Sequence, residues 1–320
     1  AAQQVECMTH RELATTAWSC AVLGIGEAKH ERASRLAGAS HLAAAASPSQ
    51  GAGGRAEFDR DADESPVPGA EGVMVALAQA ARRLPGWAGP DVSILVWALA
   101  TASQKDADLC KSAEVSLISE QHLFSGQNVA NMLWSFSKVL YSSPAAFSGL
   151  TPRVLRRMES RHLANVAWAA ATAGDSGAVS AVVEQLAGQR VTLPEAQMVL
   201  WAMASAQVPC TAVEAAVEEC IAEHWSQLAA PEVVRAVWAL AALRTQSSLP
   251  ARAAARLSLE IPCLGPQDKA NLVWALASVG IASDSFFLQL APACEADAGN
   301  MRSEEVMCVA WAYVVQYRAD

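Results

Sequence analysis

The chain has 320 residues, 52% hydrophobic and 17% charged, so it is long enough to bury a sizeable core and is not disordered throughout. Its formal net charge of −9 excludes a global electrostatic attraction to nucleic acid. None of the eight cysteines forms a C-x-x-C pair or stands at ligand spacing from a histidine, which excludes the common zinc patterns and indicates reduced thiols inside a cell.

The N-terminal part predicts two helices and then a linker. Met8–Gly24 is a helical window around Trp18, and Glu27–Ala46 also has a helical pattern, so we expect residues 1–46 to form a first helical repeat. Residues 47–70 are rich in Gly, Pro, Ser and Asp, and we predict a disordered insertion or linker there. The chain begins at Ala1 with no signal-peptide pattern, so we interpret it as a fragment or a processed form.

From residue 71 to 320 the pattern is a repeat marked by tryptophan. From Trp97 onward the steps between tryptophans are 37, 34, 33, 37, 36 and 37 residues, whereas the first step, from Trp18, is 79 and suggests two periods with an insertion. We call the following the repeat tryptophans: Trp18, Trp97, Trp134, Trp168, Trp201, Trp238, Trp274 and Trp311. A period near 35 residues is typical of a helix–turn–helix unit.

The residues around each repeat tryptophan predict one helix of about four turns, with small residues that let neighbouring helices approach. The residue after each Trp is Ala or Ser in all eight windows, and the residue five before is mostly aliphatic. We expect the indoles to act as large apolar plugs between helix layers. Position −6 is mostly acidic, which suits a helix N-terminus.

Cap signals and intervening amphipathic segments support a two-helix unit. Expected N-caps are Thr9, Ser125, Thr192 and Ser303, expected first-turn prolines are Pro194, Pro231 and Pro266, and expected closing glycines are Gly24, Gly174 and Gly280. Second helices are predicted at Glu71–Leu84, Ala178–Ala187, Thr211–Leu228, Ala251–Leu259 and Ser283–Cys294.

These patterns together predict an all-α fold, a right-handed α–α superhelix (solenoid) of about seven to eight helix–turn–helix repeats of 33 to 37 residues. The array would fill residues 71–320 with an incomplete last repeat, because only nine residues follow Trp311. No apolar run is long enough to span a membrane, so we expect no membrane partner.

No catalytic motif is present, so we expect a protein that is not an enzyme and has no cofactor, no metal site and no small-molecule substrate. The glycines at Gly24–Gly26 and Gly51–Gly54 lack the context of a dinucleotide or phosphate loop. There is no H-E-x-x-H and no G-x-S-x-G, and the histidines do not cluster with acids. His10 and His162 lie near helix starts, where we expect capping or surface roles.

A binding surface is predicted at positions −3 and +4 from Trp, which share one side of the helix and vary from unit to unit. Variable hydrogen-bonding side chains on successive helices are typical of a modular single-stranded RNA reader. The candidate base-contacting residues are Asn131, Lys138, Asn165, Thr172, Arg235 and Asn271. The alternative is structural: the asparagines could form a hydrogen-bonded ladder between repeats.

Positive charge is local. Arg153, Arg156, Arg157 and Arg161 lie within nine residues, and such a cluster could hold phosphates or could be an ordinary solvated face. Four glutamates, Glu214, Glu218, Glu219 and Glu223, would repel a nucleic acid if they faced the same groove. If Lys138, Arg157 and Arg235 converge, RNA is favoured, whereas Glu218 and Glu219 lining the groove would favour a protein partner.

The windows LANVAWAAATAG, ANLVWALASVG and VANMLWSFSKVL resemble the octotricopeptide (OPR) repeats of algal organelle proteins. They also resemble the helical repeats of FAST-kinase-like and RAP-domain proteins and of an RNA-editing substrate-binding complex subunit. The resemblance covers residues 92–317 and 8–24. It implies a non-catalytic RNA-binding factor of a mitochondrion or plastid, working in transcript processing, stability, editing or translation, with single-stranded RNA and ribonucleoprotein partners. The alternative is an armadillo-like scaffold for protein–protein interaction.

Overall fold

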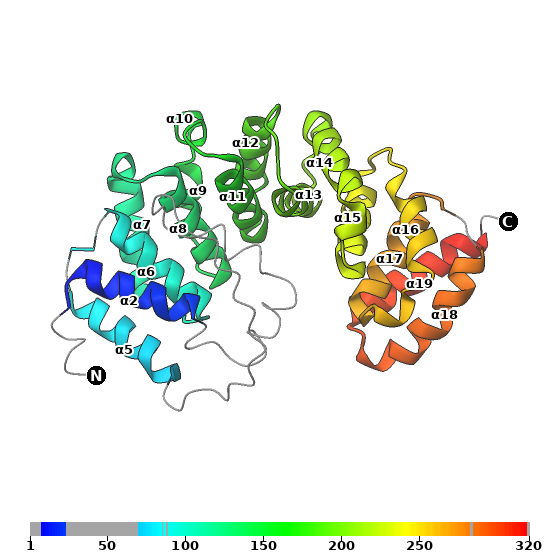
Figure 1. The fold of residues 1–320 in the computed structure, drawn as a ribbon, viewed down its shortest axis with the longest axis horizontal. Helices are drawn as coiled ribbons and strands as arrows, with labels where there is room; N and C mark the ends of the chain where they lie inside the picture. Colours follow the sequence, from blue (N-terminus) through cyan, green and yellow to red (C-terminus); the bar gives the residue numbers. More distant parts are fainter. Residues whose placement is uncertain (1–7, 24–69, 85, 88, 282–283, 319–320) are drawn as a thin grey trace. The chain divides into compact units, whose positions relative to one another are not determined.

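The computed structural model describes residues 8–23, 70–84, 86–87, 89–281 and 284–318, and in this part of the chain it contains sixteen α-helices and no strand (Figure 1). The prediction of an all-α protein is therefore confirmed. The chain divides into two compact units, Ala1–Ala169 and Ala170–Asp320, and the division falls inside helix α11 (Ser160–Ala173).

In the first unit the helices that carry the repeat tryptophans pack in chain order, and we call them A helices. They are α2 (His10–Val22), α6 (Gly89–Thr101), α8 (Gly126–Lys138) and the start of α11. α2 packs against α6, and α6 against α8 (Figure 1). The intervening helices, which we call B helices, are α5 (Ala70–Arg83), α7 (Ala107–Ser119) and the short α9 (Pro144–Ser148) and α10 (Pro152–Leu155), with the 3₁₀ turn η1 (Gln121–Leu123).

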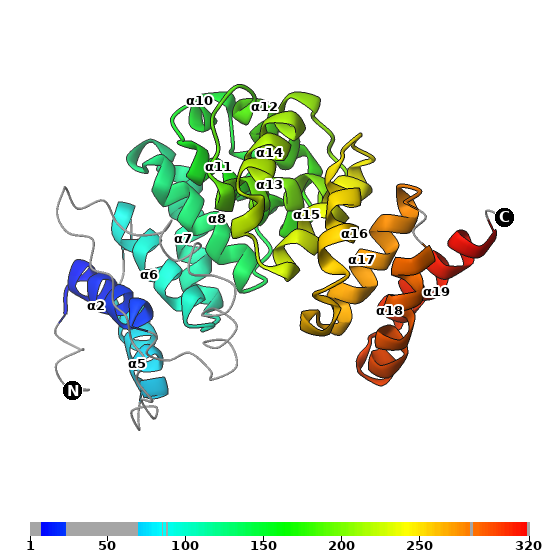
Figure 2. The same ribbon diagram turned by 45° about the vertical axis from the view of Figure 1, so that its right-hand side comes forward.

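The second unit repeats the arrangement. Its A helices are α13 (Leu193–Ala206), α15 (Ala230–Leu243), α17 (Pro266–Ser278) and α19 (Ser303–Arg318), each packed against the next (Figure 2). Its B helices are α12 (Ser176–Leu186), α14 (Thr211–Glu223), α16 (Leu249–Leu257) and α18 (Asp284–Asp297), with 3₁₀ turns η2 (Trp225–Gln227), η3 (Ile261–Cys263) and η4 (Ala298–Asn300). The five B helices predicted from the sequence all exist, with ends shifted by a few residues.

The described residues at the beginning of the array are the helices α2, α5 and α6. α2 packs directly against α6, and α5 packs against both α2 and α7. Among the described residues, α2 and α6 are therefore neighbouring A helices, although 79 residues separate Trp18 from Trp97. The helix expected at Glu27–Ala46, the linker expected at 47–70 except its last residue and the closing Gly24 lie outside the described residues.

The residue at position −6 from Trp was expected to complement the helix dipole. It also forms a hydrogen bond at the helix start. Its side chain turns back and accepts a hydrogen bond from the backbone N–H of the N-cap residue, which would otherwise have no partner at the helix start. This bond joins Thr9 to Glu12, Ser125 to Asn128, Glu159 to His162, Thr192 to Glu195, Ala229 to Glu232 and Arg302 to Glu305. Thr9, Ser125 and Thr192 are N-caps as expected, but Ser303 is the first helical residue and Arg302 takes the cap position.

Six A helices, α6, α8, α11, α13, α15 and α17, share a second feature at their C-terminal ends, a left-handed residue six positions after Trp. It is glycine at Gly174 and Gly280, as predicted, with φ of 77° and 69°, but it is Ser103, Leu140, Gln207 and Arg244 elsewhere, with φ of 53° to 57°. In each case the next residue's N–H bonds to the carbonyl two residues after Trp, as for Tyr141 to Phe136 at 2.8 Å. These bonds satisfy carbonyls at the helix ends.

The small residues beside Trp do bring the A helices together. Position +1 is buried in every A helix except at Ser19, and Ser137 Oγ of α8 donates to the Ala169 carbonyl of α11 at 2.8 Å. Only a close helix–helix approach permits a short serine side chain to reach a neighbouring backbone. The core is made by aliphatic positions such as Val129, Leu133 and Leu163, each at most 2% exposed.

The repeat tryptophans are not the fully buried plugs that we expected. Only Trp97 is buried, at 4% exposed; Trp311 is 45% exposed, and the other six are half-buried. The two tryptophans outside the repeat, Trp87 and Trp225, are also buried, at 7% and 5% exposed. The reason is geometric: the core is filled by positions −5, −2, −1 and +2, and the indole lies at the edge of that arc.

Candidate nucleic-acid interface

The half-buried edge of each A helix consists of positions −3, 0 and +4, which lie within about 100° of one another on a helix of 3.6 residues per turn. On α8 these are Asn131, Trp134 and Lys138, and on α11 they are Asn165, Trp168 and Thr172. The neighbouring positions are buried in the core. The indoles therefore belong to the same surface as the variable side chains. The spacing along the helix implies this by itself, although we expected the indoles in the core.

In the first unit the indoles of α8 and α11 touch. The ring centroids of Trp134 and Trp168 are 6.3 Å apart and the rings are tilted by 34°. The bond from Ser137 to Ala169 fixes the register of the two helices. The ring contact brings the same position of the two helices together at the edge.

Asn131 and Asn165 occupy the position one turn before these indoles. They are only 6% and 5% exposed, and neither side-chain amide makes a hydrogen bond to any residue that the structure describes. Neither amide is among the polar side-chain atoms that are buried without a partner, so both amide groups reach solvent at this edge. An unpaired amide beside an aromatic ring is suited to a ligand that brings its own donor and acceptor.

Arginines lie near the N-terminal end of α8. A side chain at Gly126, the first residue of α8, would come within 3.1 Å of the Arg157 carbonyl oxygen and 3.0 Å of Met158. Glycine here therefore allows the segment that follows α10 to rest against the start of α8. That segment presents Arg156 and Arg157, which are exposed and form no ion pair with a described residue.

Two further cations lie along the same edge. Arg161 is one turn before Asn165 on α11, is half-buried, and pairs with Glu159 at 2.9 Å. Lys138 is one turn after Trp134 and is exposed. The α8–α11 edge, which we define as Asn131, Trp134, Lys138, Arg161, Asn165 and Trp168, thus carries two amides and two indoles with cations at its ends.

His162, at the start of α11, has the capping role that we expected. Its Nδ1 accepts a bond of 3.3 Å from the Glu159 N–H, so the proton of the neutral ring is on Nε2, which is buried without a partner among the described residues. Burial lowers the pKa of His162 below its usual value, and the neighbouring Arg161 lowers it further.

The structure does not gather all the predicted residues at one place. Arg153 is exposed on α10, whereas Thr172 lies on α11 just past the division between units, with its hydroxyl buried and unpaired among the described residues. Arg235 on α15 and Asn271 on α17 belong to the second unit. The charge of Arg235 acts on Asp268, whose pKa is raised by burial and held back by this arginine.

The asparagine ladder expected as the alternative does not form, because Asn131, Asn165 and Asn271 donate no hydrogen bond to other described residues. Other residues tie the repeats together. Asn128 Nδ2 donates to Ser93 Oγ at 2.8 Å, and Gln121 Nε2 donates to the Gly149 carbonyl at 2.9 Å. The edge asparagines are thus not used for the contacts between helices.

The acidic helix α14 belongs to the B helices. Glu214 accepts a bond from Thr245 Oγ1 at 2.8 Å, and Glu218 accepts one from Ser247 Oγ at 2.6 Å. Two of the four glutamates therefore hold α14 to the segment that follows α15. Glu219 is exposed on α14.

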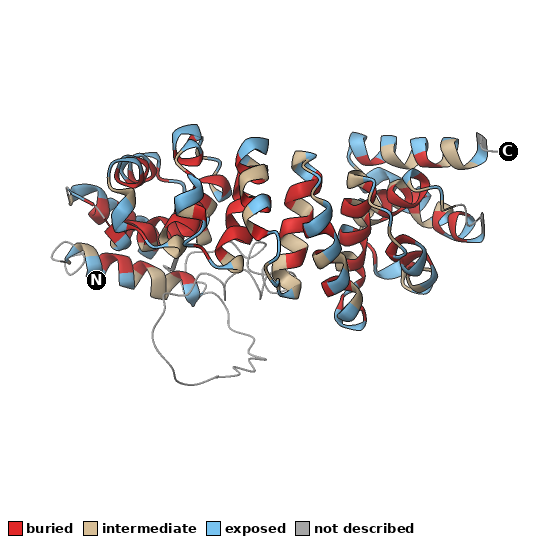
Figure 3. Cartoon of the chain, turned by 90° about the horizontal axis from the view of Figure 1, so that it is seen from above, coloured by how far each residue is buried: buried red, intermediate tan, exposed pale blue. Residues whose placement is uncertain are grey.

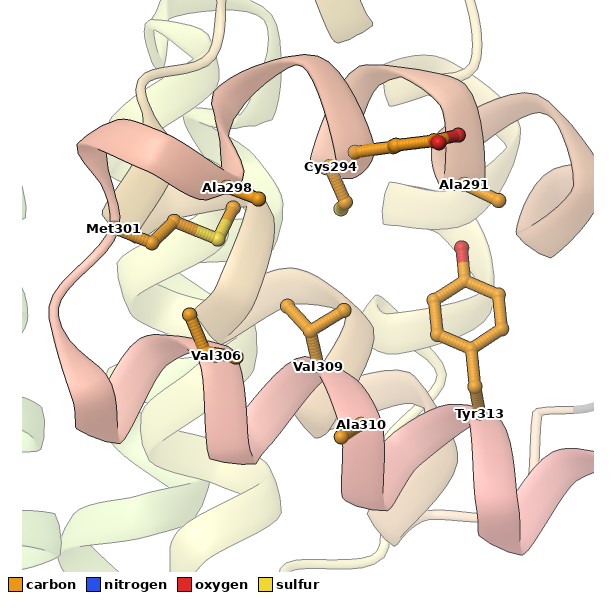
Figure 4. A pocket seen from close by; sticks show the side chains of 9 residues that line it. Ala291, Cys294, Ala298, Met301, Val306, Val309, Ala310 and Tyr313 are labelled. Atoms are coloured by element: carbon orange, nitrogen blue, oxygen red, sulfur yellow. The ribbon is translucent and has the colours of Figure 1, made fainter.

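The second unit offers a different kind of surface at α19. An apolar pocket of about 290 Å³ lies between α18 and α19, lined by Cys294, Met301, Val306 and Tyr313 among others (Figure 4). Val306, Met307, Val314 and Trp311 are between 44% and 69% exposed, although the equivalents of Val306 in every other A helix are buried. Figure 3 shows α19, which leads to the C-terminus, with few buried residues.

No family model matches the chain, and no curated protein matches its sequence. Across the described ranges, no helix is both long and apolar enough to cross a bilayer. Nor do three or more His, Cys, Asp or Glu side chains gather in those ranges in a way that would hold a metal ion.

Proposed function

We propose that this chain is a non-catalytic helical-repeat protein that binds single-stranded RNA and acts in mitochondrial or plastid RNA metabolism. The observation that carries the proposal is the α8–α11 edge, where two solvent-accessible amides without hydrogen-bond partners among the described residues lie beside two half-buried indoles. Single-stranded RNA is recognised by this combination of stacking surfaces and hydrogen-bonding groups, with cations for the phosphates. The organelle setting rests on the resemblance to OPR-type repeats alone.

The distribution of charge supports placing the RNA contacts on the first unit. Residues 70–169 carry nine Lys and Arg against seven Asp and Glu, whereas residues 170–320 carry eight against sixteen. The net charge of −9 is thus concentrated away from the α8–α11 edge. An RNA strand at this edge would meet a locally positive surface in an acidic protein.

Fluorescence anisotropy with labelled pools of single-stranded RNA, across a salt series, tests the proposal. We expect affinity to fall steeply with salt. The double variant Arg156→Gln/Arg157→Gln should reduce the slope of log affinity against log salt by about one for each phosphate that it no longer neutralises. Arg190→Gln, an exposed arginine of the second unit, is the matched control and should leave the slope unchanged. Absence of binding at low salt by the folded chain would refute the proposal.

A protein–protein scaffold is the second candidate, and the exposed apolar face of α19 with its pocket favours it. A scaffold would retain its partner after nuclease treatment and lose it when the 69% exposed Met307 is replaced by Glu. It would show no salt-dependent RNA affinity, so the anisotropy assay separates the two candidates.

A further inference from the structure

One side of α19 is exposed, whereas the same side of α15 and α17 is buried. This side consists of positions −5, −4, −1 and +3 from Trp, which lie within about 100° of one another on a helix of 3.6 residues per turn. On α15 and α17 all four positions are at most 6% exposed. On α19 all four are exposed, and Met307 at position −4 reaches 69%. We call these four residues the open face of α19: Val306, Met307, Ala310 and Val314.

On α17 the equivalent side is covered by the next two helices, because α17 packs against both α18 and α19. Lys269, at position −5 of α17, pairs with Asp297 of α18. In the first unit Ser137, at position +3 of α8, donates to the carbonyl of Ala169, at position +1 of α11. The +3 side of an A helix is thus where a small residue of the next A helix approaches. The open face of α19 continues this interface, so an α-helix is the shape that fits it.

The apolar pocket between α18 and α19 adjoins the open face. Val306 and Ala310 of the open face belong to its wall, together with Tyr313 (Figure 4). The hydroxyl of Tyr313 already donates to the Phe287 carbonyl at 2.8 Å. An apolar cavity of about 150 Å³ is large enough to hold benzene. At about 290 Å³, the pocket therefore has room for a Phe or Leu side chain from a helix that lies on the open face.

Acidic side chains border the open face and the pocket. Glu304, in the first turn of α19, and Glu295, which lines the pocket, are both exposed. Neither makes a hydrogen bond or an ion pair with a described residue. Residues 170–320 as a whole carry eight Lys and Arg against sixteen Asp and Glu. Lys or Arg side chains of a partner match this border, whereas a second copy of this acidic chain or an anionic lipid surface would be repelled.

We propose that the open face of α19 and its pocket bind a basic amphipathic α-helix of a partner protein. The apolar side of that helix lies along α19, with a small residue opposite Val314 and one large apolar side chain in the pocket. Its Lys or Arg side chains meet Glu295 and Glu304. The inference goes beyond RNA binding, which we place on the first unit, and it gives a defined chemistry to the protein partner of the second candidate function.

The probe is a labelled synthetic peptide of about 18 residues, long enough to form a helix, with Leu, Ala and one Phe on its apolar side and Lys on its polar side. We expect it to bind the whole chain in a fluorescence anisotropy assay. Met307→Glu should weaken binding by at least about tenfold, because it places a carboxylate in the apolar contact. The added negative charge would instead strengthen a non-specific attraction of the peptide. The matched control, Ile118→Glu, adds the same charge at a 52% exposed position of α7 and should not weaken binding.

Two further comparisons test the pocket and the charges separately. Replacing the Phe of the peptide by Ala should weaken binding by about tenfold. Ala298→Trp, which puts a large side chain in the wall of the pocket, should remove this difference between the two peptides. Glu304→Lys should weaken binding of the basic peptide by about two- to fivefold, whereas Glu219→Lys, at an exposed position of α14, should have little effect.

Unchanged binding in Met307→Glu would overturn the inference, as would equal binding of a peptide with Glu in place of Lys, or no binding of the basic peptide at all. A dimer that Met307→Glu dissociates in sedimentation would assign the face to a second copy, and binding to anionic vesicles that Met307→Glu abolishes would assign it to a membrane. Either result would also overturn it. Absence of RNA binding would remove the proposed function alone, because the peptide assay contains no RNA. Thermal unfolding shows whether each variant is folded, and Val314→Glu, at a 48% exposed position, replaces Met307→Glu if that variant is unfolded.

Discussion

The hydroxyl of Tyr141 donates a hydrogen bond of 2.9 Å to the carboxylate of Glu114, from the end of one A helix to the preceding B helix. Ser143 Oγ donates to the other oxygen of the same carboxylate at 2.8 Å, and Lys111 pairs with it from the previous turn. Burial by itself would raise the pKa of Glu114, but these three bonds hold it below its usual value. The tie recurs in the second unit between Glu214 and Thr245.

Glu114→Ala should destabilise the protein by about 2–3 kcal/mol, because it leaves the buried hydroxyl of Ser143 and the half-buried hydroxyl of Tyr141 without their charged acceptor. Glu219→Ala removes an exposed glutamate from another B helix and should change stability by less than about 0.5 kcal/mol. Urea unfolding followed by circular dichroism measures both. Equal effects of the two substitutions would show that the carboxylate does not join the repeats.

Leu140→Gly should stabilise the protein by about 0.5–1 kcal/mol. Leu140 is 77% exposed, so its side chain contributes little burial, but its φ of 53° is a left-handed conformation that costs a non-glycine residue about 1–2 kcal/mol. Part of that gain is offset by the greater freedom of glycine in the unfolded chain. Leu140→Ala keeps the strained φ and is the control that should bring no gain in the midpoint of thermal unfolding.

The stability of the protein should fall as pH drops below about 6.5, in part through His162. Its pKa is lower folded than unfolded, so the unfolded chain binds the proton more readily, and the stability that His162 contributes above pH 6.5 is lost as pH falls toward the folded pKa. His162→Asn should flatten this part of the pH profile, because Asn128 fills the same cap position on α8 without titrating. An unchanged slope of stability against pH in the variant would contradict this role.

Trp97→Ala and Trp168→Ala should differ in cost. Trp97 is 4% exposed, so its truncation should cost about 3–5 kcal/mol, whereas Trp168 is half-buried and should cost roughly half as much. If Trp168→Ala cost as much stability as Trp97→Ala, the Trp168 indole would have to be fully buried. The midpoints of denaturant unfolding of the two variants measure the difference. A larger effect at Trp168 than at Trp97 would show that the Trp168 indole is a core residue.

The periodic sequence was enough to predict the helices, because each carries its own local signals. An acid or amide three residues into the helix and small residues beside Trp act within one or two turns, and the expected A and B helices appear where those signals are. The left-handed conformation of Leu140 and Arg244 at the helix ends could not be predicted. Packing imposes this strained backbone conformation, and no glycine marks it in the sequence. The packing of α2 against α6 could not be predicted either, because residues 24–69 lie between them in the sequence.

By itself, the sequence determined the period, the helical class and which positions vary, since these depend on spacing along a helix. Only the tertiary structure decided that the indoles lie at the surface edge and that Asn131 and Asn165 are nearly buried yet unpaired among the described residues. The physical reason is that burial and hydrogen-bond satisfaction depend on what a neighbouring helix covers. Close packing of α8 on α11 through Ser137 buries most of both asparagines, leaves their amide groups accessible to solvent and leaves the rings half-buried.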